Sequence, residues 1–191
     1  MSGQAQRMPQ EREDTAIQSL LRDLHSRDGM VRQSARRTLV SMGRPAVPIF
    51  IRALDSDNRN VRWEAAKALE EIGDPSAAEA LVAKLDHDHF GIRWLVAEGL
   101  ISFGRQGLEP LLLALLNDPD AAFLREGAHH VLHALCDADP SLQDILSPLA
   151  EALGAFAETG EIIPRVQAVL KAIRDKCDTH RTEISEQTRE Q

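Results

Sequence analysis

The sequence predicts an all-α fold in which helical hairpins stack into an α-solenoid. Hydrophobic residues make up 43% of the 191 residues, aromatic residues only 4%, and tyrosine is absent, a balance that favours closely packed helices over β-sheet. The segment VRWEAAKALEEIG at 61–73 returns 31 residues later as IRWLVAEGLISFG at 92–104. A fixed period of this length is typical of repeat proteins, whose units must stack to bury their apolar faces.

An arginine marks the second helix of each predicted hairpin. Four copies align at steps of 30, 31 and 32 residues, on Arg32, Arg62, Arg93 and Arg125. Apolar residues recur at positions −1, +3, +7 and +10 relative to the arginine, which is one side of an α-helix. Three of these helices are followed directly by a glycine that can close a helix in the left-handed conformation, namely Gly43, Gly73 and Gly104.

A first helix precedes each of these second helices. Apolar residues lie three and four positions before a leucine in every copy, and the leucines are Leu24, Leu54, Leu85 and Leu116. Pro45 and Pro75 suit the first turn of a helix, where the missing N–H has no intrahelical partner. An aspartate four or five residues before each arginine is placed to cap the second helix, and these are Asp28, Asp57, Asp88 and Asp120.

These patterns divide the chain into an array with polar ends. The array is expected over 13–177, with approximate repeats 13–43, 44–73, 74–104, 105–137 and 138–177. The fifth repeat is less regular than the others and is interpreted as a terminal cap. Residues 1–12 and 178–191 are polar and lack periodicity, so both ends are expected to be disordered.

The net charge of −8 disfavours nucleic acid and anionic lipid as partners, because the mean field repels phosphate. No apolar stretch is long enough for a signal peptide or a membrane span. Cys136 and Cys177 lie outside any CxxC pair, which is typical of unpaired thiols in a reducing compartment. The sequence therefore predicts a cytoplasmic protein with no membrane association.

The arginine, the alanine three residues later, the leucine seven residues later and the closing glycine resemble the short HEAT-like repeats of the phycobilisome lyase (PBS lyase) type. An aspartate ahead of the unit and GDP at 73–75 behind it belong to the same pattern. The resemblance covers about residues 14–136 well and 141–177 loosely. It implies an armadillo-like, right-handed superhelix of about five HEAT-like hairpins, whose second helices line a concave binding groove. Bilin lyase subunits have similar repeats, so handling of a tetrapyrrole is the alternative function that the resemblance implies.

The side of each second helix opposite its apolar stripe is formed by positions +1, +5 and +8. These positions hold Gln33, Arg37, Val40, Trp63, Lys67, Glu70, Trp94, Glu98, Ile101, Glu126, His130 and His133. The mixed charges form no continuous phosphate-binding track, and a protein or peptide is therefore the expected partner. Trp63 and Trp94 either anchor that partner or pack over neighbouring helices as structural residues.

The four arginines form a ladder along the array. The sequence predicts that Arg32, Arg62, Arg93 and Arg125 pair with turn aspartates, of which Asp57, Asp88 and Asp120 are the partners between repeats. Such pairs fix the spacing of repeats more than they stabilise them. The ladder is interpreted as structural.

No pattern in the sequence predicts catalysis. His129, His133 and Cys136 lie at i, i+4 and i+7 and are side chains that zinc accepts, but a closed site needs a fourth ligand from elsewhere. A glycine-rich phosphate loop and a nucleophile elbow are absent from the sequence. The sequence therefore predicts a non-catalytic scaffold that binds a protein or peptide without a cofactor, and it determines neither the oligomeric state nor the partner.

Overall fold

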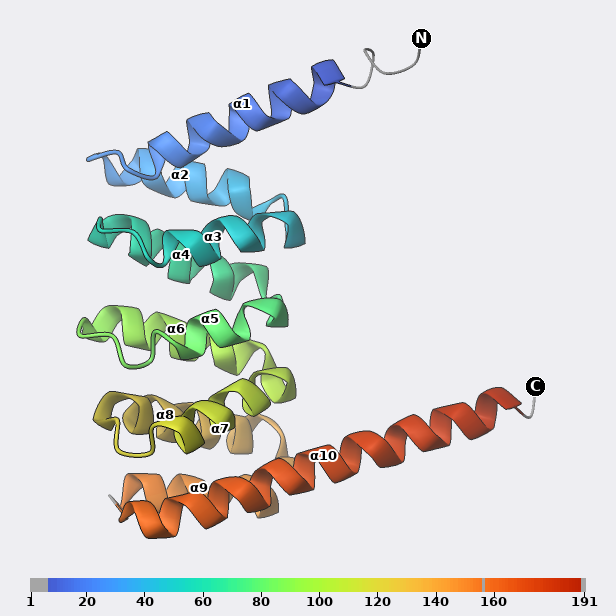
Figure 1. Cartoon of the computed structure of the whole chain (residues 1–191). Helices are drawn as coiled ribbons and strands as arrows, with labels where there is room; N and C mark the ends of the chain where they lie inside the picture. The colour runs from blue at the N-terminus through green and yellow to red at the C-terminus, as the bar shows by residue number, and fades with distance from the viewer. Residues whose placement is uncertain (1–6, 156, 190–191) are drawn as a thin grey trace.

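A computed structural model describes the backbone of residues 7–155 and 157–189 and the side chains of residues 15–155 and 157–175. Within these ranges the chain forms ten α-helices and four short 3-10 turns, and no strand. The fold class predicted from the sequence is confirmed: the protein is an all-α solenoid of helical hairpins (Figure 1).

The helices follow one another in hairpins joined by short turns. The α-helices are α1 (Arg7–Asp23), α2 (Gly29–Val40), α3 (Val47–Ala53), α4 (Arg59–Ile72), α5 (Ala78–Val82), α6 (Phe90–Ser102), α7 (Leu108–Asn117), α8 (Ala122–Ala138), α9 (Gln143–Gly154) and α10 (Thr159–Arg189). The 3-10 turns are η1 (Arg44–Ala46), η2 (Pro75–Ala77), η3 (Gly104–Gly107) and η4 (Pro140–Leu142). Each 3-10 turn leads directly into the next α-helix, so the first helix of a hairpin starts with a tight turn.

The helices are arranged in two layers. The second helices pack against one another in chain order, α2 on α4, α4 on α6 and α6 on α8. In Figure 1, α4, α6 and α8 lie behind α3, α5 and α7, and α5 in turn packs against α7. We call the row of α2, α4, α6, α8 and α9 the second-helix layer, and its solvent-exposed side the second-helix face.

The fifth hairpin enters this arrangement the other way round. Its first helix, α9, packs against α8, and its second helix, α10, packs against both α9 and α7. Figure 1 shows α10 in front, on the side of α7, with α9 behind it. The last helix of the second-helix layer is therefore α9, the first helix of its own hairpin. It runs antiparallel to α8.

The core is built from the apolar stripe that the repeat pattern defines. The leucines at position +7, Leu39, Leu69, Leu100 and Leu132, are completely buried. Position +3 is equally buried and is occupied by the small residues Ala35, Ala65, Val96 and Ala128. Large side chains at one position and small ones at the other let adjacent helices interdigitate at close range.

The caps of the second helices lie at a single position, four residues before the ladder arginine. Asp28 accepts a hydrogen bond from the Met30 amide at 2.8 Å, and Asn58 accepts one from the Asn60 amide at 2.9 Å. In α6 the Nδ1 atom of His89 accepts from the Gly91 amide at 3.1 Å. The prediction of an aspartate cap is therefore right for Asp28 only.

Asp57, Asp88 and Asp120 are not the caps that the sequence predicts, because each lies one residue before the capping position. All three are exposed. The capping position in the fourth repeat is Ala121, which offers no side-chain hydrogen bond. A shift of one residue is decisive here because only the capping residue itself faces the free amides of the first turn.

The ladder arginines also bind groups other than the expected aspartates. Arg32, Arg62 and Arg93 each donate to the backbone carbonyl six residues earlier, at 2.9, 2.6 and 2.8 Å. Arg125 instead donates to the Ala157 carbonyl of the next repeat at 2.5 Å. No described ladder arginine forms an ion pair with Asp57, Asp88 or Asp120. Arg32, Arg62 and Arg93 therefore fasten the turn within their own hairpin, whereas Arg125 ties α8 to the turn between α9 and α10.

One ion pair lies inside the array between α2 and α4. Arg36 and Glu64 are buried, with 2% and 8% of their surfaces exposed. The Nε atom of Arg36 donates to Glu64 at 2.9 Å, Arg36 also pairs with Glu71, and Arg32 lies 3.6 Å from Glu64. Two buried charges are tolerated here because each is compensated by the other.

The two end helices extend further than the sequence predicts. The structure is helical at residues 7–12 and 178–189, where disorder is expected, while residues 1–6, 190 and 191 lie outside the described residues. The segments are rich in Glu, Gln and Arg, which have high helix propensity. Local propensity accounts for a helix in a segment that has no apolar periodicity of its own.

We predict that Arg36→Met destabilises the protein by about 3 kcal/mol, because it leaves the Glu64 carboxylate buried without its closest partner. Urea unfolding followed by circular dichroism measures the change. Arg37→Met is the matched control, because Arg37 is exposed and its loss is expected to change stability by less than about 0.5 kcal/mol. The double variant Arg36→Met/Glu64→Met should be more stable than Arg36→Met alone, and a less stable double variant would contradict this account.

Candidate protein-binding face

The second-helix face carries the residues that the sequence proposes for partner binding. Trp63 and Trp94 are 40% and 47% exposed. Arg37, Glu126 and His133 are also exposed, and the half-buried members are Gln33, Val40, Lys67, Glu70, Glu98, Ile101 and His130. All of these residues therefore reach the surface of the molecule.

Trp63 on α4 lies against the first turn of α6. A β-carbon added to Gly91 would be 2.5 Å from the Cζ3 atom of the Trp63 ring, closer than any van der Waals contact. The absence of a side chain at Gly91 is therefore what admits the indole. The ring has one edge on the next repeat and 40% of its surface exposed, so it both packs and remains accessible.

Trp94 on α6 lies in the same way against α8, one repeat further along. Its ring stacks on that of His130 with a centroid distance of 4.7 Å and an interplanar angle of 30°. The Nε2 atom of His130 is 3.0 Å from a carboxylate oxygen of Glu98, one turn after Trp94. This contact holds the imidazole against the indole and fixes the orientation of both rings.

Two phenylalanines join the tryptophans, and the sequence analysis did not identify them. Phe90 and Phe123 are 62% and 41% exposed at the starts of α6 and α8. The guanidinium of Arg93 lies 3.9 Å from the ring centroid of Phe123 and 5.7 Å from that of Phe90. Both residues lie where the sequence predicts a turn, and a large apolar residue at such a place is the signal that could have indicated them. The first turn of a helix buries little of its side chains, so a large apolar side chain there stays exposed.

A cavity of about 250 Å³ opens between α6 and α8 on this face. Its lining combines aromatic rings with charged groups and consists of Phe90, Arg93, Trp94, Ala97, Glu126, Gly127, His129 and His130. We call it the aromatic pocket. It has room for one side chain of a partner.

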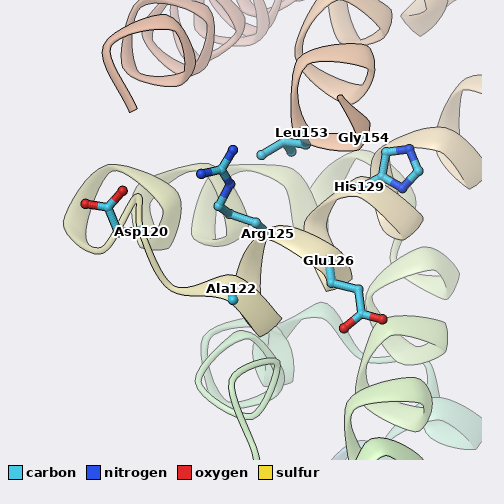
Figure 2. Close-up of a pocket in the computed structure, with 7 residues that line it drawn as sticks. All are labelled: Asp120, Ala122, Arg125, Glu126, His129, Leu153 and Gly154. Atoms are coloured by element: carbon cyan, nitrogen blue, oxygen red, sulfur yellow. The ribbon is translucent and has the colours of Figure 1, made fainter. Parts of the chain in front are cut away.

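A second cavity, of about 320 Å³, lies next to it between the start of α8 and the end of α9 (Figure 2). It is lined by Asp120, Ala122, Arg125, Glu126, His129, Leu153 and Gly154. Figure 2 shows the Glu126 carboxylate pointing away from Leu153 and Gly154, toward the preceding repeat. Glu126 therefore lies on the boundary between the two cavities, with its charge directed to the aromatic pocket.

Acidic side chains gather in the middle of the second-helix face. Burial raises the pKa of Glu70; Lys67 opposes that shift, and the negative charge of Glu98 adds to it. A raised pKa means that the ionised carboxylate is less favourable here than in water. The raised pKa of Glu70 therefore reports first its partial burial and only then the negative charge of the neighbouring Glu98.

The three residues with zinc-ligand side chains do not converge on one point. The rings of His129 and His133 are 6.2 Å apart, and the Sγ atom of Cys136 lies 3.8 Å from the Ser147 hydroxyl on α9. No group of three histidine, cysteine or acidic side chains suited to a metal ion occurs among the described residues. His129 instead packs against Gly154 of α9.

Residues 17–100 match the family model described as HEAT repeats. This part of the chain is therefore similar to HEAT repeats. The crystal structure of an engineered protein is similar over 91% of this chain and 85% of that one, with 21% sequence identity and a TM-score of 0.43. None of the curated proteins that were compared matches the chain. No described helix has both the length and the apolar character that crossing a bilayer requires.

We predict that Gly91→Ala displaces the Trp63 ring from α6 and increases its exposure, because the new methyl group would occupy the position of the ring edge. Acrylamide quenching of the Trp63 fluorescence, measured in a Trp94→Phe background, should increase. Gly160→Ala is the control, since a β-carbon there would meet no atom within 4 Å. Unchanged quenching in the Gly91 variant would show that the indole does not lie on α6.

Proposed function

We propose that the chain is a non-catalytic scaffold that binds a protein or peptide segment along the second-helix face, with Trp63 and Trp94 as anchors. HEAT repeats generally serve as protein-interaction scaffolds. The observation that carries the proposal is the row of partly exposed aromatic rings at the same position of consecutive repeats. Large aromatic side chains at such positions are enriched among residues that dominate binding free energy.

The preorganisation of the rings supports this proposal. Each indole is held from one side, Trp63 at Gly91 and Trp94 on His130, and 40% and 47% of the two residues remain exposed. A side chain that is already fixed loses little conformational entropy when a partner binds. The mixed charges around the rings would supply orientation, as the polar rim of an interface does.

The finer assignments made from the sequence stay predictions. The match is to HEAT repeats in general, so the phycobilisome lyase type and the handling of a tetrapyrrole rest on the resemblance alone. The cytoplasmic location and the prediction that nucleic acid is a disfavoured partner rest on composition and charge. The proposal of a peptide-binding face depends on none of these assignments.

We predict that peptides selected from a random 12-residue phage library on the immobilised full chain bind through the tryptophans. Trp63→Ala and Trp94→Ala should each weaken the best peptide by about 2 kcal/mol, or about 30-fold in Kd. Fluorescence anisotropy with the labelled peptide measures the affinity.

Leu113→Ala is the matched control, because Leu113 is 45% exposed on α7, outside the second-helix layer, and its truncation should leave the affinity unchanged. Circular dichroism must show that each variant is folded. A folded Trp63→Ala/Trp94→Ala variant that keeps full affinity would contradict the proposal.

A further inference from the structure

The aromatic pocket offers ring faces together with one carboxylate, that of Glu126. Trp94 and Phe90 line it with their ring centroids 6.3 Å apart, and both are well exposed. Glu126 stands at its edge with 62% of its side chain exposed. An aromatic face and a nearby carboxylate both attract a cation, the first through the ring quadrupole and the second through its charge.

The protein itself already places a guanidinium in this type of surrounding. Arg93 lies over the Phe123 ring and, at a longer distance, over the Phe90 ring, and its Nη2 atom is 3.8 Å from Glu126. Arg93 is held in place by the carbonyls of His87 and Asp88, so it lines the pocket and does not fill it. One face of the Trp94 ring is covered by His130, and no arginine or lysine lies over the Trp94 ring among the described residues.

The charges of the second-helix face change along the array. Arg37 is exposed on α2, whereas the exposed and half-buried carboxylates of Glu70, Glu98 and Glu126 follow on α4, α6 and α8. Lys67 and Arg36 act on Glu70, and Arg93 lies 3.8 Å from Glu126. Arg93 and Arg125 also donate to backbone carbonyls of turns. The whole chain carries a net charge of −8, so an acidic segment would be repelled both at long range and at the pocket.

We propose that the aromatic pocket binds the cationic side chain, arginine or lysine, of the peptide segment that the second-helix face holds. This inference rests on the proposed function and adds the chemistry of the occupant. The cation stacks on the Trp94 and Phe90 rings and faces the Glu126 carboxylate. Trp63 then holds an apolar residue of the same segment one repeat toward the N-terminus.

The pocket is tested first with small probes on the full chain. N-acetylarginine amide is positively charged, and N-acetylcitrulline amide has nearly the same shape without the charge. The chain has two tryptophans, so ¹⁵N NMR shows two indole signals, which Trp63→Phe and Trp94→Phe assign. The arginine probe should shift the Trp94 signal saturably, and the citrulline probe should shift it far less.

Glu126→Gln should weaken the response to the arginine probe by about fivefold, the size expected for the loss of about 1 kcal/mol of attraction at an exposed site. Glu79→Gln removes the same charge from an exposed position on α5, outside the second-helix layer, and should leave the response unchanged. Equal shifts with both probes, no shift, or a Glu79 effect as large as the Glu126 effect would overturn the inference.

The selected peptides separate the inference from the proposed function. Peptides that depend on Trp63 and Trp94 should contain a basic residue, and replacing it with citrulline should weaken binding about fivefold to the natural chain and far less to Glu126→Gln. Tryptophan-dependent peptides whose required residue is acidic or apolar would overturn the cationic occupant and leave the proposed function standing. The absence of any tryptophan-dependent peptide would overturn both.

Discussion

The structure depends on one constraint, which is that no hairpin of this chain can bury its own apolar stripe. Leu39, Leu69, Leu100 and Leu132 are fully buried in the stacked array, and a repeat of this kind cannot bury its apolar face without its neighbours. Burying each such side chain stabilises the fold by about 2 kcal/mol, and the gain accrues at interfaces between repeats. Stacking therefore determines the helix positions, and the exposed side of each second helix is left free for binding.

The residue at position +4 of the second helix differs between the middle repeats and the ends of the array. Position +4 of the second helix is Ala66 and Ala97 in the middle repeats, and both are buried. In the first repeat it is Arg36, compensated by Glu64, and in the fourth it is His129, packed on Gly154 of α9. Polar side chains occupy this position where the packing changes, at the first repeat and at the junction with the inverted fifth hairpin.

The inverted hairpin also shapes the candidate site. Since α9 takes the place of a further second helix, it runs antiparallel to α8 and brings Leu153 and Gly154 beside His129 and Glu126. The second cavity forms at this junction, and the Glu126 carboxylate points away from Leu153 and Gly154, toward the preceding repeat (Figure 2). The end of the array and the aromatic pocket are thus linked through consecutive turns of α8.

The sequence by itself determined the repeat, the two helices of each hairpin and the side of each second helix that faces solvent, because these follow from local periodicity. Trp63 and Trp94 could be placed on one face for that reason. Only the tertiary structure decided that the cap lies four residues before each ladder arginine and that the arginines bind turn carbonyls. It alone revealed that Phe90 and Phe123 join the tryptophans and that α9 continues the second-helix layer. These features depend on distances between helices and on which side of the stack the chain crosses, and residue spacing along one helix carries no information on either.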